Sequence, residues 1–263
     1  MAVRLSTALV NKLMDTGSFK DIFANGVIDI WSGTQPATAD AAATGTLLCT
    51  VTKSSGTWTQ ETKAQGTVTF SGTIGGSITA INVNSIDILG ATVTPVTDVT
   101  TTAALVAAAI NNNPKNLLFT ATSALGVVTI TAVNGLGTLP NGWTVTASVT
   151  TITATPANMG SGGAATAGVN SANGLTFGNA TAGVLSKAVS ETWSGNCVAD
   201  GTAGWFRLRT SGDAGTALDS GLIYPRFDGS IATSGAQMNL GSLTLTNTAP
   251  FIIPVAAFTL PQS

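Results

Sequence analysis

The sequence contains no histidine and few charged side chains. Asp, Glu, Lys and Arg make up 8% of its 263 residues, against about 25% in an average soluble domain. Without histidine the chain lacks the most common general base and metal ligand, which excludes Ser–His–Asp and Cys–His catalysis. The formal net charge of −2 provides little attraction for nucleic acid or anionic lipid. We therefore expect a protein that is not an enzyme, holds no metal or other cofactor, and binds neither nucleic acid nor a membrane.

Long apolar runs are also missing, and we expect no transmembrane helix. Charges at Arg4, Lys12 and Asp15 interrupt the N-terminal segment, so we expect it to lack the continuous apolar region of a secretory signal. The two cysteines, Cys49 and Cys197, are far apart in the sequence and have no CxxC spacing. A disulfide between them is one alternative, and two small buried thiols in a protein made in the cytosol are the favoured one.

A region with almost no charge interrupts the chain. Between Gly66 and Ala165 the charged residues are Asp87, Asp98 and Lys115, and loop-like sequence rich in Gly, Ser and Ala flanks the region. We infer that a domain is inserted into a host domain that both ends of the chain build. The predicted boundaries are 1–65 and 164–263 for the two parts of the host domain and 66–163 for the inserted domain.

Alternation of β-branched and polar residues between glycines predicts four strands in the inserted domain. These strands are expected at residues 66–72, 118–122, 127–133 and 143–149. Between the first two strands, a threonine N-cap, an alanine-rich body and a stop before Pro114 predict a helix. Its buried face is expected to consist of Leu105, Val106, Ala109 and Ile110.

The host domain is predicted to begin with a helix over residues 5–14, which carries one apolar stripe of Leu5, Leu9, Leu13 and Met14. Short strands follow, with glycine or proline at nearly every junction. They are expected at 26–33, 45–52, 174–178, 184–188, 191–195, 202–210, 240–245 and 251–260. The predicted fold is therefore mainly β: a β-sandwich or jelly-roll-like host domain with a short N-terminal helix and a small inserted α+β domain.

Acidic residues offer two weak functional signals. Asp213, Asp219 and Asp228 are close in sequence but lack the spacing of a calcium-binding loop, so surface Asx turns are favoured. Glu191 lies two residues from Trp193 without a second acid nearby, and a structural role is favoured over that of a glycosidase carboxylate.

The strand at 202–210 combines aromatic and basic residues. Phe206 and Leu208 are expected to face the core, which leaves Trp205, Arg207 and Arg209 on an exposed or interface face. Stacking of this face on sugars or bases is the less favoured alternative. The residues we predict to lie in subunit contacts are Leu5, Leu9, Trp31, Trp205, Arg207 and Arg209.

Several segments resemble a known family. Trp31-Ser-Gly-Thr-Gln-Pro36 with the following Ala39-Asp40, and Gly204-Trp-Phe-Arg207, lie in segments that resemble tailed-bacteriophage virion proteins. The segments 66–88, 101–113 and 117–132 of the inserted domain are similar to small α/β modules that are inserted in phage tail and sheath proteins. The resemblance implies a virion structural protein and no catalytic residues.

We therefore expect a capsid decoration or cement protein that contacts the major capsid protein or other virion proteins and copies of itself. Such a protein assembles in the host cytoplasm and resides in the virion. A surface of small, uncharged residues suits these contacts because little side-chain entropy is lost when it is covered. The alternatives are a tail, collar or head–tail completion component, or a fibre-like module that binds a host surface glycan. Candidate sugar platforms for that module are Trp31, Trp58, Trp143, Trp193 and Trp205.

Overall fold

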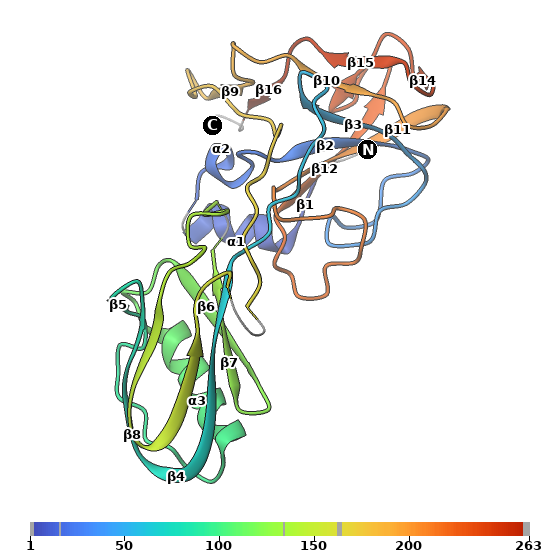
Figure 1. Ribbon diagram of the computed structural model, residues 1–263. Helices are drawn as coiled ribbons and strands as arrows, with labels where there is room; N and C mark the ends of the chain where they lie inside the picture. Colours follow the sequence, from blue (N-terminus) through green and yellow to red (C-terminus); the bar gives the residue numbers. More distant parts are fainter. Residues whose placement is uncertain (1–2, 16, 134, 162–164, 260–263) are drawn as a thin grey trace. The chain divides into compact units, whose positions relative to one another are not determined.

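Antiparallel sheets dominate the computed structural model of the chain (Figure 1), which describes residues 3–15, 17–133, 135–161 and 165–259. Strands account for 42% and helices for 11%, which confirms the predicted mainly β class. The chain divides into two compact units: unit 1 comprises Met1–Gln60 and Ser171–Ser263, and unit 2 comprises Glu61–Asn170. The predicted boundary at 163/164 and the last residue of the predicted strand 251–260 lie outside the described residues.

A large sheet forms the frame of unit 1, with the strand order β1-β12-β11-β2-β3-β10-β15. These strands are β1 (Arg4–Leu5), β2 (Val27–Ser32), β3 (Leu47–Lys53), β10 (Trp193–Asn196), β11 (Gly201–Arg209), β12 (Arg226–Ala232) and β15 (Pro250–Ile253). The short strands β13 (Met238–Asn239) and β14 (Thr244–Leu245) pair with β12 and β11, and β9 (Val184–Ser186) pairs with β16 (Ala257–Thr259).

One face of this sheet carries the hydrophobic core of unit 1. Period-two alternation places Ile28 and Ile30 of β2 and Phe206 and Leu208 of β11 on this face, and all four side chains are buried. Helices α1 (Thr7–Asp15) and α2 (Phe19–Ile22) add the side chains of Leu9 and Phe19 to the same cluster. The core face is therefore where the sequence pattern predicted it on β11.

The N-terminal helix is shorter than predicted and buries a different face. Residues 4–5 form β1, which pairs with β12, and the Ser6 hydroxyl then caps α1 by accepting a hydrogen bond from the Leu9 N–H. Ala8 and Leu9 are the buried residues of α1, whereas Met14 is 80% exposed. The predicted stripe of Leu5, Leu9, Leu13 and Met14 is therefore wrong, because its first residue belongs to a strand and its last two face solvent.

Unit 2 is a five-stranded sheet with the order β5-β4-β7-β6, in which β8 also pairs with β4. Its strands are β4 (Gln65–Val83), β5 (Ile86–Asp87), β6 (Phe119–Ala124), β7 (Val127–Ala132) and β8 (Val145–Ala157). β4 and β8 are longer than predicted because their pairing resumes after an irregularity between Ser71 and Gly76, where Gly72, Gly75 and Gly76 adopt positive φ.

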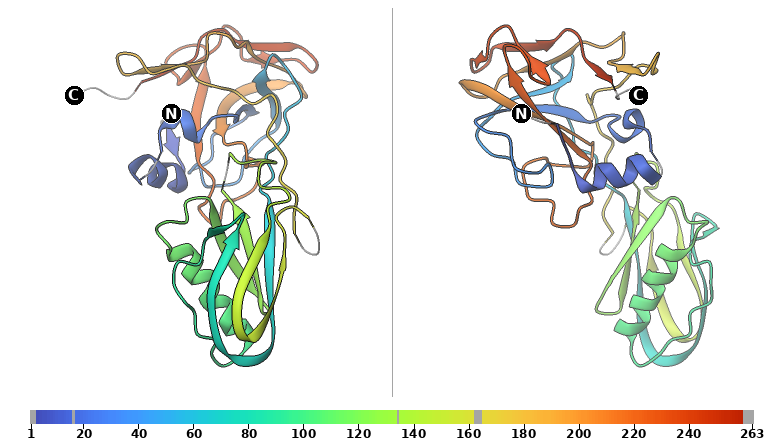
Figure 2. Two further views of the ribbon diagram at one scale, coloured as in Figure 1. Left: turned by 60° about the vertical axis from the view of Figure 1, so that its left-hand side comes forward. Right: turned by 180° about the vertical axis from the view of Figure 1, so that it is seen from behind.

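Helix α3 (Val99–Asn112) packs against the sheet of unit 2 (Figure 2). Its N-cap is Asp98, whose carboxylate accepts a hydrogen bond from the Thr101 N–H at 2.7 Å, so the predicted threonine cap is wrong. The buried face consists of Thr102, Ala103, Val106, Ala107 and Ile110, and the predicted core residue Leu105 is exposed. No helix in the described ranges has the length and apolar character needed to cross a membrane.

Candidate functional site

The second face of the unit 1 sheet carries a buried cluster of charges, which we call the arginine–aspartate network. Five of its six members lie on β2, β11 and β12 at positions that alternate with the core residues, and Asp213 lies in the loop that follows β11. Each of these residues is at most 6% exposed. Its members are Arg207, Arg209, Arg226, Asp29, Asp213 and Asp228.

In all three ion pairs, two guanidinium nitrogens donate to the two carboxylate oxygens, and in two of the pairs both distances are 2.9 Å or less. The Nε and Nη2 atoms of Arg207 donate to the two carboxylate oxygens of Asp228, each at 2.8 Å. The same two nitrogens of Arg226 donate to Asp213 at 2.6 and 2.9 Å. Two parallel hydrogen bonds fix the orientation of both groups, which a single contact does not do.

The third pair connects strands β2 and β11. Arg209 donates through Nε to Asp29, and the Thr50 hydroxyl of β3 donates to the other oxygen of Asp29 at 2.7 Å. The guanidinium carbon of Arg209 lies 4.3 Å from the centre of the Trp58 ring, a cation–π contact. This end of the network therefore joins three strands and the segment that follows β3.

The guanidinium groups also hold the two long loops that cover the sheet, through Nη1 of Arg207 and Arg226 and through Nη2 of Arg207. Arg207 donates to the carbonyl oxygens of Gly215 at 2.8 Å and Ala41 at 3.1 Å, and Arg226 donates to that of Ala217 at 3.0 Å. Because carboxylate and carbonyl oxygens surround these guanidinium groups, the network fastens loops 33–46 and 210–225 to the sheet. It does not present a cation to an anion from solution.

Two tryptophans extend the network along the sheet. The rings of Trp31 and Trp205 stack at 5.7 Å between centroids with 12° between their planes. The guanidinium of Arg207 lies 5.4 Å from the Trp205 ring centre, and the Trp205 indole N–H donates to the carbonyl of Thr44 in the first loop. The aromatic pair therefore anchors the same loop that Arg207 holds.

Burial sets the electrostatics of these pairs. Burial raises the pKa of Asp228 above its ordinary value, and the hydrogen bonds and charge of Arg207 oppose the rise without cancelling it. At Arg226, burial disfavours the charged form, but the hydrogen bonds and charge of Asp213 outweigh this effect and raise the pKa. The charged state of each group thus depends on its partner, so removal of one partner leaves a costly buried charge.

The structure corrects most of the predicted contact residues. Leu9, Trp31, Trp205, Arg207 and Arg209 are all buried within the chain, so their side chains are not on a surface that a second subunit touches. Both faces of β11 are covered, one by the core and the other by the two loops. Among the predicted contact residues, Leu5 is accessible, with 41% of its surface exposed.

The aspartates also lie elsewhere than predicted. Asp213 forms an Asx turn, because its carboxylate accepts the Gly215 N–H at 2.8 Å, but it is buried rather than on the surface. Asp228 belongs to strand β12, which was not predicted. One signal could have revealed the network: Asp29 lies within an apolar strand, and a carboxylate is rarely buried there without a cationic partner.

The second covering loop presents apolar side chains to solvent. Leu218, Leu222 and Ile223 are 64%, 46% and 59% exposed. Between them, buried Asp219 accepts the Tyr224 N–H at 2.8 Å, and its own N–H donates to the carbonyl of Asp40. We call Leu218, Leu222 and Ile223 the apolar loop tip. Its side chains are exposed, although hydrogen bonds of Asp219 fix the backbone between them.

Asp40 links this loop to the N-terminal helix. Its carboxylate accepts the N–H and the hydroxyl of Thr7, the first residue of α1. Ser6 accepts the Arg226 N–H and donates to the Tyr224 carbonyl. The start of α1 and the loop that carries the apolar tip are therefore one hydrogen-bonded assembly.

Glu191 has the structural role that the sequence favoured. Its carboxylate accepts hydrogen bonds from the N–H and hydroxyl of Thr176 and from the indole N–H of Trp193, and lies 3.4 Å from the Lys53 ammonium. Burial acts to raise the pKa of Glu191, but these hydrogen bonds outweigh it and hold the pKa below the ordinary value of 4.5.

We expect the stability of unit 1 to depend on the ionisation of Glu191. Because its pKa is lower in the folded chain, its contribution is complete above the unfolded value of 4.5 and is lost as the pH falls through the folded value. Glu191→Gln should lower the melting temperature at pH 7 by a few degrees and flatten its decline below pH 4.5. Asp15→Asn, which removes a carboxylate at an exposed position, is the control variant for the loss of one charge. An unchanged profile in Glu191→Gln would contradict this role.

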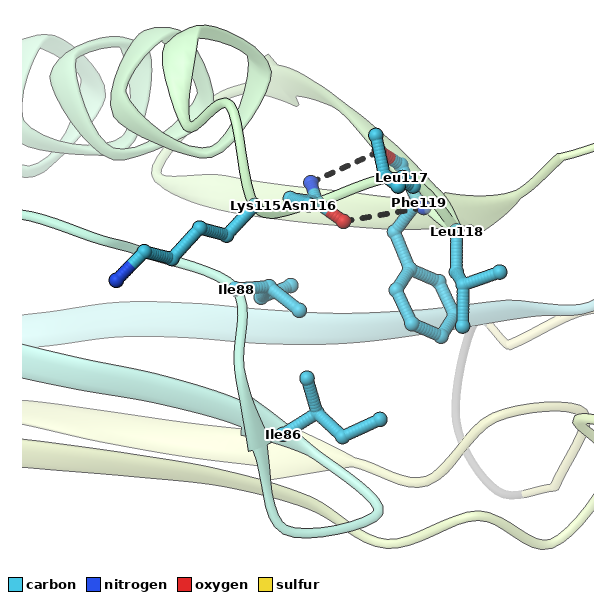
Figure 3. Close-up of a pocket in the computed structure, with 7 residues that line it drawn as sticks. All are labelled: Ile86, Ile88, Lys115, Asn116, Leu117, Leu118 and Phe119. Atoms are coloured by element: carbon cyan, nitrogen blue, oxygen red, sulfur yellow. Dashed lines mark hydrogen bonds between the residues drawn. The ribbon is translucent and has the colours of Figure 1, made fainter.

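Unit 2 contains a recess of about 330 Å³ beside β5 (Figure 3). Its walls are apolar, with Lys115 and Asn116 as the polar lining residues. The Asn116 amide is already engaged, because it donates to the Phe119 carbonyl at 2.9 Å and accepts the Phe119 N–H at 3.2 Å. The recess therefore combines apolar contacts with one ammonium group and lacks the convergent polar groups of a typical ligand site.

Comparison with known proteins adds no relative. No protein-family model, curated protein or solved structure matches the chain. Among the described residues, no group of three or more Cys, Asp or Glu is placed to hold a metal ion. The network and the apolar loop tip are thus the features on which a function rests.

Proposed function

We propose that the chain is a non-enzymatic structural protein of a tailed-bacteriophage particle and acts as a capsid decoration or cement protein. The observation that carries the proposal is the apolar loop tip, in a loop whose backbone carbonyls accept hydrogen bonds from the buried network. Its three large side chains are exposed in a chain that has only 8% charged residues. A grouped exposed apolar surface is typical of a site for contact with another protein.

Rigidity is what makes this loop suited to an interface. Arg207 and Arg226 hold its backbone through the carbonyls of Gly215 and Ala217, and Asp219 closes the turn before Tyr224. A loop that is already ordered loses little conformational entropy on binding, so more of the contact energy contributes to affinity. This arrangement supports attachment to a capsid surface over catalysis.

We also propose roles for the two units. Unit 1 is a sandwich or jelly-roll-like host domain that makes the contacts with the major capsid protein and with copies of the chain. Unit 2 is an inserted α+β domain, whose scarcity of charge suits it to the crowded surface of a virion. Leu5 and the exposed Val10 and Met14 of α1 extend the apolar surface that unit 1 offers to neighbours.

Stability of heads that lack the chain tests the decoration role. We expect such heads to release DNA at a lower temperature than complete heads, and we expect added purified chain to raise the release temperature to that of complete heads. Equal release temperatures would contradict the cement function. Stable heads that fail to acquire tails would instead identify the alternative, a head–tail completion component.

The apolar loop tip gives the sharper prediction. Leu218→Ser/Leu222→Ser/Ile223→Ser should weaken binding to chain-free heads by about 30-fold or more, since central apolar contacts often contribute 2 kcal/mol or more. Sedimentation of heads with labelled chain measures the affinity. The matched control is Val189→Ser, a fully exposed apolar residue of unit 1 outside this loop. Equal affinities for the triple variant and the control would refute the contact.

The glycan-binding alternative has less support. Trp31, Trp193 and Trp205 are buried, so they offer no ring face to a sugar. Trp58 and Trp143 are half-buried, and the ring of Trp58 already contacts Arg209. Binding of the isolated chain to a glycan array, lost on Trp143→Ala, would favour this alternative over the structural role.

A further inference from the structure

The two cysteines lie opposite each other in the core of unit 1. Cys49 of β3 and Cys197, just after β10, are partners in an antiparallel bridge that continues the β3–β10 pairing. Both are buried and carry free thiols, as the favoured prediction from the sequence had it. What the sequence did not reveal is that residues so far apart in the chain are direct cross-strand neighbours.

The hydrogen bonds identify the type of pair. The adjacent Val198 N–H donates to the Leu48 carbonyl at 2.8 Å, whereas the N–H and carbonyl of Cys197 bond to Ala249 and Thr248 on its other side. Cys49 and Cys197 therefore form a non-hydrogen-bonded pair, in which the Cα atoms are about 4.5 Å apart and the side chains are closest. This separation falls within the range that a disulfide spans, about 4.4–6.8 Å.

The surroundings leave room for the sulfur atoms. A Cβ at Gly195 would clash with the Thr50 carbonyl oxygen and would meet the Sγ of Cys49 at 3.0 Å, so glycine there leaves space for both the β3 backbone and the sulfur. Burial raises the pKa of the Cys49 thiol, and the neighbouring Cys197 and Asp29 raise it further. The thiolate, which is the reactive form, is therefore scarce in the folded chain.

We propose that Cys49 and Cys197 are a latent cross-link site that forms an intrachain disulfide when the chain meets a small-molecule disulfide such as oxidised glutathione. One cysteine thiolate attacks the small disulfide, forms a mixed disulfide and releases one small thiol. The second cysteine thiolate attacks the protein sulfur of this mixed disulfide and releases the other small thiol. Both protons pass to solvent and the two released thiolates take them up, so the protein is oxidised by two electrons and the small disulfide is reduced.

The position of the bond determines its effect. It joins β3 to the segment after β10, and the closed loop contains all of unit 2. Closure of so long a loop strongly lowers the conformational entropy of the unfolded chain. A bond at an existing cross-strand pair requires little change in the folded structure. Once formed, the bond cross-links the sheet on which the arginine–aspartate network lies.

Refolding in a redox buffer tests the site. The full chain is unfolded in its reduced form, refolded with reduced and oxidised glutathione, and analysed by mass spectrometry after alkylation under denaturing conditions. We expect a monomer that is lighter by two hydrogen atoms, takes up no alkylating agent and melts at least about 5 °C higher than the reduced chain. Because the folded thiols are buried and protonated, the same oxidant should act much more slowly on the folded protein.

Single variants provide the control. Cys49→Ala and Cys197→Ala each keep one thiol, so each should take up glutathione or alkylating agent and show no rise in melting temperature with oxidant. If the refolded wild-type chain remains alkylated at both cysteines, or links only to other chains, the proposal is wrong. A cross-link that forms but lowers the melting temperature would also overturn it, because the pair would then not match disulfide geometry.

Discussion

Arg207→Met should lower the free energy of unfolding of unit 1 by about 3–5 kcal/mol, the cost typical of removing one partner from a buried ion pair. The change leaves the carboxylate of Asp228 in the interior without its bidentate partner. It also removes the donors to the carbonyls of Gly215 and Ala41, so both covering loops lose an anchor. Urea unfolding followed by tryptophan fluorescence measures the loss.

Two further variants separate charge burial from packing. Arg207→Met/Asp228→Leu removes both charges and should recover much of the stability, since a matched apolar pair needs no desolvation of ions. Lys115→Met removes one positive charge at an exposed position and should change stability by less than about 0.5 kcal/mol. If Arg207→Met behaves like Lys115→Met, the network does not hold unit 1 together.

Trp193→Ala should destabilise unit 1 by about 3–5 kcal/mol, the range for loss of a large aromatic side chain from a core. The side chain is fully buried and packs edge-to-face against Phe177 with ring centroids 5.3 Å apart. Its indole N–H also donates to Glu191 at 3.0 Å, and that acceptor would lose a partner. The measurement is again urea unfolding, with circular dichroism because the change removes a fluorophore.

Trp193→Phe is the matched variant. It keeps an aromatic ring against Phe177 but removes the indole N–H, so it should cost clearly less than Trp193→Ala. Equal losses for both variants would assign the effect to the Glu191 hydrogen bond alone. A loss below about 1 kcal/mol for Trp193→Ala would show that this side chain is not part of a close-packed core.

The strands were predictable where one face is apolar and the other is not. Phe206 and Leu208 of β11 and Val128 and Ile130 of β7 alternate with other residues, and the structure buries all four. Such alternation is local information, which the sequence carries directly. The helix limits were less predictable, because the tertiary pairing of β1 with β12 decides where α1 begins.

The arginine–aspartate network was missed because its partners are distant in the chain. Arg209 and Asp29 are separated by 180 positions, and Arg207 and Asp228 by 21. Alternation on β11 correctly divided the strand into two faces, but it does not show that a pair of loops covers the second one. The position of Asp29 among apolar residues was the available clue. That Arg209 is its partner follows only from the register of β2 against β11, which the sequence does not give.

The same limit applies to function. Low charge and the absence of histidine reduce the range of chemistry, yet neither indicates where a partner binds. The contact surface depends on which apolar residues stay exposed after folding. No sequence pattern around Leu218, Leu222 and Ile223 distinguishes these exposed residues from core residues.

The number of copies of the chain in purified phage particles tests the structural role most directly. Quantitative mass spectrometry of intact particles, with the major capsid protein as internal reference, provides this number. The proposed decoration role predicts many copies in a fixed ratio to the major capsid protein. Absence of the chain from purified particles would contradict a virion role, and a few copies per particle would contradict decoration in favour of a tail or collar position.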